Sequence, residues 1–297
     1  IMVFKKETNM IAEVKPFFDA SSNTISYIVR DPQSRHAVII DSVLGFDYAS
    51  GTIMYTQADD IINYVESEQL IIDWHVETHV HADHISAAPY LQERCGGLIA
   101  ISEHIIDVQK TFGKFFNAGT EFKRNGDQFD KLFKDQDIFR IGSLEATCMH
   151  TPGHTPACMT YFIGDAAFVG DTLFMPDGGT ARADFPGGNA KILYHSIQNI
   201  LALPGNTRIF VCHDYMPGGR DFNYQTSVND QKSHNIHVKA GISEGEFITM
   251  RETRDSNLSM PDLIMPSIQV NMRAGKMPPS ENNGETYLKI PLSGLRN

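Results

Sequence analysis

The pattern of apolar and polar positions predicts two strands near the start of the chain. Residues 24–29 (TISYIV) and 37–41 (AVIID) are rich in β-branched residues, and each run is short enough for a strand. The polar run Asp31-Pro32-Gln33-Ser34 between them favours a turn. A pair of adjacent strands is therefore expected here.

The pattern then alternates between helical and extended segments. Residues 57–68 place Ile61, Ile62 and Val65 at helical spacing, and residues 70–76 read as a buried strand. The alternation continues with a helix at 85–94, a strand at 98–101 and a helix to about residue 116 that Ser102 would cap.

The middle of the chain is richer in strands. Strands are predicted at 138–141, 145–150, 157–163 and 166–170, then a helix at 190–203 and a strand at 208–212. Beyond Lys239, Ser243 and Glu246 form a capping box for one more helix, while Pro261, Pro266, Pro278 and Pro279 indicate a partly irregular tail. We therefore expect a catalytic domain over residues 1–239, with an extension over 240–297 that packs on the same domain.

Composition narrows the class of protein. The 297 residues are 41% hydrophobic and 21% charged, and no run reaches the roughly 20 apolar residues of a membrane span. Residues 1–6 (IMVFKK) lack the apolar stretch of a secretory signal, so a cytoplasmic location is expected, or the mitochondrial matrix if a presequence has been removed. A formal charge of −11 and the absence of a Lys/Arg run disfavour nucleic acid as a partner.

A dense group of possible metal ligands follows the strand at 70–76. His79, His81, Asp83 and His84 lie within six consecutive positions, and imidazole with carboxylate suits Zn, Fe or Mn. Three more candidates, His154, Asp171 and His213, each follow a predicted strand, where open sheets place their sites. Seven such residues in this arrangement indicate a metalloenzyme.

These motifs resemble the metallo-β-lactamase superfamily. HxHxDH at 79–84, TPGHT at 151–155, GDTLF at 170–174 and the late His213 occur in the family's order. The resemblance implies an α/β fold of the four-layer αβ/βα sandwich type with a C-terminal extension. Two branches keep all seven ligand positions: the glyoxalase II thioesterases and the persulfide (sulfur) dioxygenases.

The neighbouring residues favour the dioxygenase branch. Its members resemble this chain in GDTLF followed by Arg182-Ala183-Asp184-Phe185, and in His213-Asp214-Tyr215. The resemblance implies one Fe²⁺ per chain, held by His79, His154 and Asp171. The expected reaction is oxidation of glutathione persulfide, or a similar small persulfide, with O₂ and water to sulfite and thiol. Two imidazoles and one carboxylate are typical of non-haem iron oxygenases.

The remaining site residues receive supporting roles from the same resemblance. The set His81, Asp83, His84 and His213 would orient ligands and carry protons, or would hold a second metal. Asp83, His84 and Tyr215 are candidate catalytic groups, and Arg182, Tyr215 and His237 are candidate substrate contacts. His237 stands near where many relatives carry an arginine that would help to bind glutathione. The identity of the thiol that carries the persulfide is therefore left open. Structural roles compete with these substrate contacts: Arg182 could form an ion pair with Asp184, and Tyr215 could pack at a strand end.

The main alternative is a glyoxalase II-like thioesterase (hydroxyacylglutathione hydrolase), which would fill two metal sites and attack a thioester with hydroxide. A nuclease is opposed by the negative charge. Cys158 and Cys212 lie near site histidines, and burial is the favoured interpretation for both. The resemblance is also compatible with a homodimer.

Overall fold

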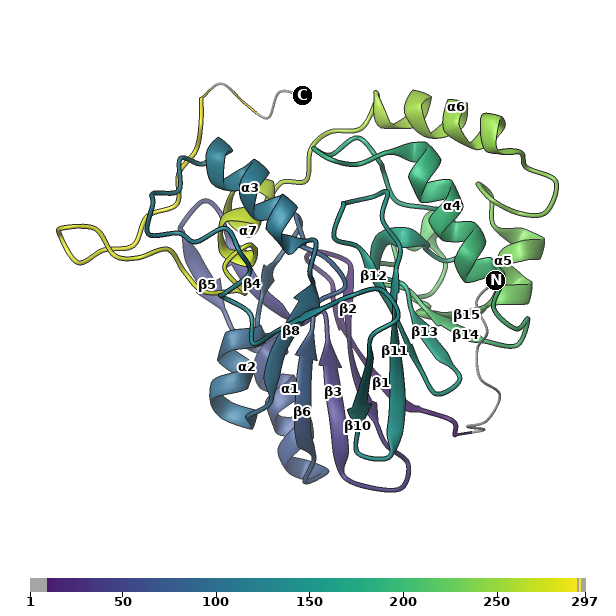
Figure 1. Cartoon of the computed structure of the whole chain (residues 1–297), viewed down its shortest axis with the longest axis horizontal. Helices are drawn as coiled ribbons and strands as arrows, with labels where there is room; N and C mark the ends of the chain where they lie inside the picture. The colour runs from purple at the N-terminus through teal and green to yellow at the C-terminus, as the bar shows by residue number, and fades with distance from the viewer. Residues whose placement is uncertain (1–9, 293, 295–297) are drawn as a thin grey trace.

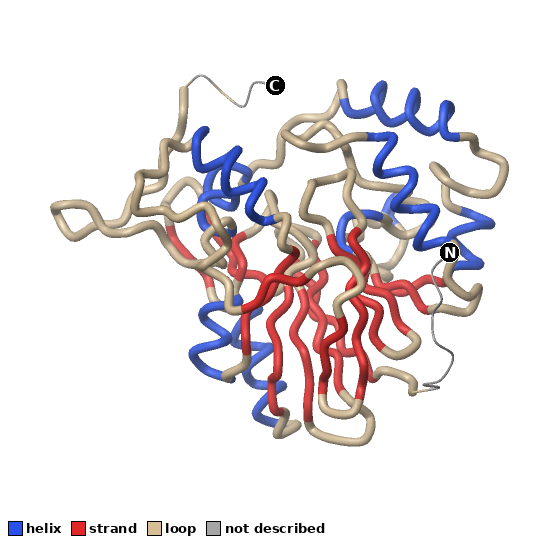
Figure 2. Tube along the Cα trace, in the orientation of Figure 1, coloured by secondary structure: helices blue, strands red, loops and turns tan. Residues whose placement is uncertain are grey.

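Two six-stranded β-sheets form the centre of the molecule (Figures 1 and 2). The computed structural model describes residues 10–292 and 294. The first sheet has the order β1 (Glu13–Asp19), β2 (Thr24–Arg30), β3 (His36–Ile40), β6 (Ile71–Val76), β8 (Leu98–Ser102) and β9 (Lys131–Phe133). The second has the order β10 (Ile138–Ile141), β11 (Leu144–His150), β12 (Met159–Ile163), β13 (Ala166–Phe168), β14 (Arg208–Phe210) and β15 (Gln225–Ser227). A small sheet contains β5 (Thr52–Met54), β4 (Val43–Asp47) and β7 (Ile85–Ser86).

Helices cover the outer faces of the two large sheets (Figure 1). The helices of the first half are α1 (Thr56–Ser67), α2 (Ala88–Cys95) and α3 (Ile105–Phe115). Those of the second half are α4 (Ala190–Leu201), α5 (Val228–His234), α6 (Glu244–Asp255) and α7 (Ile264–Asn271), with short 3₁₀ turns at η1 (Gly170–Thr172) and η2 (Pro217–Gly219). Helix, sheet, sheet and helix make four layers, so the predicted αβ/βα sandwich is confirmed.

The alternation of side chains along β2 shows how the layers are held together. Tyr27 and Val29 belong to the apolar cluster between the two sheets, whereas Ile28 faces the cluster beneath α1 and α2. Successive side chains of a strand point to opposite faces, so a strand with apolar layers on both sides needs apolar residues at every position. The Tyr27 hydroxyl also donates a hydrogen bond of 2.6 Å to the Val211 carbonyl just after β14, which ties the second sheet to the first.

Two predicted helix starts were wrong. Ile85 and Ser86 form β7, which pairs with β4, and α2 begins only at Ala88. Ser102 is the last residue of β8, where it pairs with Phe133, so it does not cap α3. In both places sheet pairing with a distant segment extends the strand, and the local sequence does not reveal that pairing.

The C-terminal segment is more regular than its prolines suggest. The capping box of Ser243 and Glu246 forms as predicted at the start of α6. The segment predicted to be irregular also contains α7, in which Pro266 lies in the first turn, where a missing backbone N–H costs no helical hydrogen bond. Residues 1–6, on which the secretory-signal prediction rests, lie outside the described residues. Within the described part of the chain, no helix has the length and apolarity to cross a membrane.

Candidate metal centre

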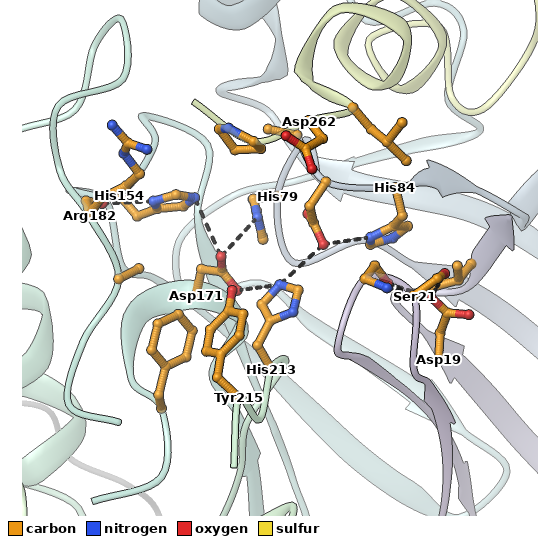
Figure 3. Close-up of a pocket in the computed structure, with 18 of the residues that line it drawn as sticks. Asp19, Ser21, His79, His84, His154, Asp171, Arg182, His213, Tyr215 and Asp262 are labelled. Carbon is orange, nitrogen blue, oxygen red and sulfur yellow. Dashed lines mark hydrogen bonds and ion pairs between the residues drawn. The ribbon is translucent and has the colours of Figure 1, made fainter. Parts of the chain in front are cut away.

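The ends of four strands bring the predicted ligands together at one edge of the sandwich. His79 follows β6, His154 follows β11, Asp171 follows β13 within η1, and His213 follows β14. Gly170, at φ +51°, allows the close approach of Asp171, because a Cβ at residue 170 would lie 2.5 Å from Thr78 Oγ1. Figure 3 shows the side chains of all four ligands pointing toward a common centre.

Three of these side chains form a compact group. The Nε2 atoms of His79 and His154 lie 3.9 and 3.6 Å from Asp171 Oδ2. All three side chains are buried or nearly so, and their ligand atoms lie within 4.8 Å of one another. Two imidazoles and one carboxylate therefore converge on a single point.

Hydrogen bonds on the far side of each ring orient these two histidines. His79 Nδ1 lies 3.0 Å from Thr78 Oγ1, which itself donates to Asp41, and His154 Nδ1 donates to the Arg182 carbonyl at 2.8 Å. In each neutral ring the proton is therefore on Nδ1, and the Nε2 lone pair faces the carboxylate of Asp171. Lone pairs that converge on a buried carboxylate need a cation between them. The residues present thus fit a divalent metal ion.

His81 takes part in a different group. Its Nε2 lies 3.0 Å from Asp41 Oδ1 and 3.3 Å from Glu77 Oε2. Burial lowers the pKa of His81, but the carboxylates of Asp41 and Glu77 outweigh this effect and raise the pKa well above its usual value. Burial and the neighbouring charge of His81 lower the pKa of His79 well below its usual value. The lowered pKa of His79 favours the neutral ring that a metal needs, whereas the carboxylates beside His81 Nε2 favour a proton on that nitrogen. His81 Nδ1 is buried without a hydrogen-bond partner among the described residues, and His81 also forms a group of possible metal ligands with Asp83 and His84.

A second cluster adjoins the first. Asp83 Oδ2 lies 3.3 Å from His84 Nδ1 and 3.6 Å from His213 Nε2, and it accepts a 3.0 Å hydrogen bond from Thr24. His213 Nε2 is also 3.2 Å from Asp171 Oδ1, while its Nδ1 lies 3.2 Å from the Asn23 carbonyl. Burial lowers the pKa of His213, but Asp171 and Asp83 raise it to about 9. His84 Nε2 is buried without a hydrogen-bond partner.

The centre opens into a cavity of about 680 Å³ (Figure 3). His79, His84, His154, Asp171 and His213 line its floor, whereas His81 is absent from the described residues that line it. The turn between β1 and β2, strand β4 and the segment after α6 supply the walls. This volume suits a small-molecule substrate.

The three predicted substrate contacts lie in different places. Arg182 lines the cavity, but its guanidinium donates to Asp184 at 2.6 and 2.8 Å and to the Ser259 carbonyl at 2.6 Å. Tyr215 also lines the cavity, with its ring stacked on His213 at a centroid distance of 5.8 Å. His237 lies outside the main cavity, where its Nδ1 accepts a hydrogen bond from the backbone N–H of Thr180 at 3.0 Å.

Two cavity arginines were missed by the sequence analysis. Arg251 and Arg254 of α6 both line the cavity, because the helical spacing i, i+3 puts them on one face of the helix. Arg251 is buried and paired with Asp255 at 2.7 Å. Arg254 is exposed and has no ion pair among the described residues. The signal that could have found them is the capping box, which fixes the register of α6.

Asn271 at the end of α7 was also missed. Its Nδ2 donates to the carbonyls of His81 and His84 at 2.9 and 2.8 Å, and its Oδ1 accepts from the Ser86 backbone N–H at 2.8 Å. One buried amide thus fixes the loop that carries the HxHxDH motif. No local signal marks it, since the contact spans more than 180 residues.

The cysteines near the site are buried, as predicted. Burial raises the pKa of Cys158 to about 12, and it raises that of Cys212 well above its usual value. The Cys212 thiol donates to Asp41 at 3.6 Å, and the Cys158 sulfur accepts from the Thr155 N–H at 3.3 Å. Neither cysteine is among the described residues that line the cavity.

This fold and centre place the chain in a known family. The model of the metallo-β-lactamase superfamily matches residues 22–213, and the chain belongs to that superfamily. The crystal structure of ETHE1 from Myxococcus xanthus has 32% sequence identity and a TM-score of 0.70, covering 89% of this chain and 100% of that one.

Relatives with higher identity carry other names. A "probable metallo-hydrolase" of Burkholderia pseudomallei is 51% identical over 95% of this chain and 99% of its own length. "Glyoxylase B2" of Dictyostelium discoideum is 46% identical over 96% and 98%. The mitochondrial persulfide dioxygenase ETHE1 of Homo sapiens is 29% identical over 90% of both chains. The superfamily is thus established, and the names within it divide between hydrolysis and oxidation.

Proposed function

We propose that this chain is a metal-dependent enzyme of the metallo-β-lactamase superfamily that acts on a derivative of a small thiol. Within that class, we propose the oxidation of a low-molecular-weight persulfide at one Fe²⁺ held by His79, His154 and Asp171. The names of the more similar relatives support hydrolysis better than oxidation. The observation that supports oxidation, and on which this proposal rests, is the group of His79, His154 and Asp171, to which His81 does not belong.

The position of His81 bears on the number of metals. In a binuclear hydrolase, His81 would share the first metal with His79 and His154. Here its ligand atoms are not grouped with the ligand atoms of those two rings, and its Nε2 is 3.0 Å from Asp41. With Nε2 held by Asp41, only the buried and unpartnered Nδ1 of His81 is left for a metal, and the possible ligands with which His81 groups are Asp83 and His84 rather than His79 and His154. The ligands left are two imidazoles and one carboxylate, which leave several coordination positions open for substrate and O₂.

Neighbouring carboxylates also favour a protonated His213, which would not bind the metal through the protonated nitrogen. Its pKa, raised to about 9 by Asp171 and Asp83, keeps a proton beside the Asp171 carboxylate at neutral pH. A protonated His213 holds Asp171 Oδ1 at 3.2 Å, so Oδ2 remains directed at His79 and His154. His213 is then a positioning group with a proton to give, and Asp83 holds its orientation.

The reaction is balanced with persulfide, O₂ and water as reactants. RSSH + O₂ + H₂O gives RSH + SO₃²⁻ + 2 H⁺, in which the terminal sulfur is oxidised and both O₂ atoms form bonds to it. Water completes the sulfite, the S–S bond breaks, and the thiol leaves. The metal, when bound, supplies the redox chemistry that lets O₂ react with sulfur. Tyr215 and His84 border this space and are placed to donate hydrogen bonds to the substrate.

A carboxylate on the thiol carrier fits Arg254. His237, at the position where an arginine was expected, is neutral, because burial and the charges of Arg251 and Arg254 lower its pKa to about 4. Arg182 and Arg251 are neutralised by Asp184 and Asp255. Arg254 is therefore the arginine without an ion pair among the described residues that line the cavity, and glutathione, with two carboxylates, is a carrier of suitable charge.

The second candidate function is hydrolysis of a glutathione thioester. The names of the relatives at 51% and 46% identity favour it, and the cluster of Asp83, His84 and His213 could hold a second metal. A metal hydroxide would then attack the thioester carbonyl and release an acid and a thiol. The same cavity and the same Arg254 would serve this substrate.

Paired assays on one anaerobic preparation distinguish the two functions. We expect O₂ uptake that depends on glutathione persulfide, with sulfite as product, and negligible hydrolysis of S-lactoylglutathione. Asp171→Ala should abolish O₂ uptake. Thioester hydrolysis without persulfide-dependent O₂ uptake would overturn the dioxygenase and establish the second candidate.

A further inference from the structure

A second, smaller cavity shares His154 with the main one as a lining residue. It has a volume of about 20 Å³, enough for one molecule of the size of water or O₂. Helices α3 and α7 contribute Val108, Phe112, Ile264 and Ile268 to its walls, and Val80 of the HxHxDH loop closes it. These residues belong to one buried apolar cluster.

The polar atoms at this cavity are already hydrogen bonded. His154 Nδ1 donates to the Arg182 carbonyl, and its Nε2 faces Asp171. The Thr155 hydroxyl lies 3.1 Å from Cys158 Sγ and accepts from the Ala157 N–H at 3.3 Å. A buried water needs two to four polar partners, and apolar cavities without them stay dry and take up apolar guests such as xenon. This cavity therefore suits a small apolar molecule.

A thin wall separates the small cavity from the metal centre. Ala82, His154 and Phe185 line both cavities. The Phe185 and His154 rings meet edge to face at a centroid distance of 5.3 Å, and the Arg182 guanidinium lies 4.8 Å from the centroid of the Phe185 ring. Phe185 thus stands between the two spaces next to a metal ligand.

We propose that the small cavity holds O₂ and supplies it to the metal centre past Phe185 and Ala82. This inference rests on the proposed dioxygenase function and adds a separate route for its second substrate. The persulfide, which is anionic and larger, enters through the main cavity beside Arg254. The two substrates then reach the same centre through different cavities.

Xenon binding and oxygen kinetics test this route. Crystals of the whole chain under xenon pressure should show xenon among Val108, Phe112 and Ile268. Val108→Phe fills the cavity, and we expect the KM for O₂ to rise about threefold or more, with kcat at saturating O₂ and the KM for persulfide unchanged. Ile105→Phe is the matched control, since it changes the same helix one turn away and Ile105 does not line the cavity.

The outcomes separate the inference from the function on which it rests. Overpacking destabilises many proteins, so Val108→Ile serves as a smaller filling variant if Val108→Phe does not fold. O₂ consumption with an unchanged KM for O₂ in the folded filling variant overturns the inference alone, as does the absence of xenon from the wild-type cavity. A wild-type enzyme that consumes no O₂ overturns the dioxygenase function and the inference together.

Discussion

His81 Nε2 lies 3.0 Å from Asp41 Oδ1, and the same carboxylate oxygen accepts a 2.7 Å hydrogen bond from the Thr78 backbone N–H. Asp41 thereby fixes the start of the HxHxDH loop from two sides. Its second oxygen accepts from Thr78 Oγ1, the atom that orients His79. Asp41 therefore links the orientation of His81 to that of His79.

We expect His81→Gln to keep its metal. The glutamine amide can still donate to Asp41, but the charge is lost, so the free energy of unfolding should fall by roughly 2 kcal/mol. Metal analysis of purified protein and thermal unfolding measure the two effects. His79→Gln is the matched control and should lose the metal. Equal metal loss in both variants would contradict the account and make His81 a ligand.

Asn271 provides a test of the C-terminal segment. Asn271→Ala removes the donor to two carbonyls of the metal loop and leaves them buried without partners, so stability should fall by about 2 kcal/mol and metal affinity should fall with it. Chelator competition and urea unfolding measure these changes. Gln269, on the same helix, donates to the Lys289 carbonyl instead, so Gln269→Ala should leave metal affinity unchanged. Unchanged metal affinity in Asn271→Ala would show that the metal loop keeps its conformation without Asn271.

Arg254 should affect the KM of an anionic substrate. We expect Arg254→Ala to raise the KM for glutathione persulfide about tenfold, with little change in kcat, because the contact is remote from the reacting sulfur. Arg254→Lys keeps the charge and should recover part of the loss. Steady-state kinetics over a range of salt concentrations measure both variants. The role fails if Arg254→Ala has the wild-type KM.

The cysteines should differ in reactivity. Burial raises the pKa of Cys158 to about 12, and it raises those of Cys148 and Cys212 as well, so few thiolates exist at pH 8 in these three. Iodoacetamide at pH 8 should therefore label Cys95, which is partly exposed, before the others. Mass spectrometry of the native and the urea-unfolded protein makes the comparison. Early labelling of Cys212 in the native protein would contradict the structure.

The strands and the position of the candidate metal centre could be predicted because their signals are local. β-branched runs mark β2, β3 and β6, and each metal ligand follows a strand within a few residues, so the position of the site follows from strand ends. The glycine of the TPGHT motif has a structural reason, since Gly153 has φ +135° and a Cβ there would lie 2.3 Å from the Leu193 backbone.

The features that were missed depend on contacts across the sequence. β7 is a strand only because it pairs with β4, and α7 is stable because it packs on β7 and α3. Arg254 becomes a cavity residue through the packing of α6 on α4. The supporting role of His81 was expected from the family resemblance, but its partner Asp41, forty residues earlier in the chain, was not.

Metal titration tests the single-metal centre most directly. Apo protein titrated with Co²⁺ under anaerobic conditions, followed by absorbance, should bind one equivalent tightly. His84→Ala and His213→Ala should each still bind one equivalent, whereas His154→Ala and Asp171→Ala should bind none. Two tight equivalents in the wild type, reduced to one by His84→Ala, would contradict the account and indicate the binuclear centre of a hydrolase.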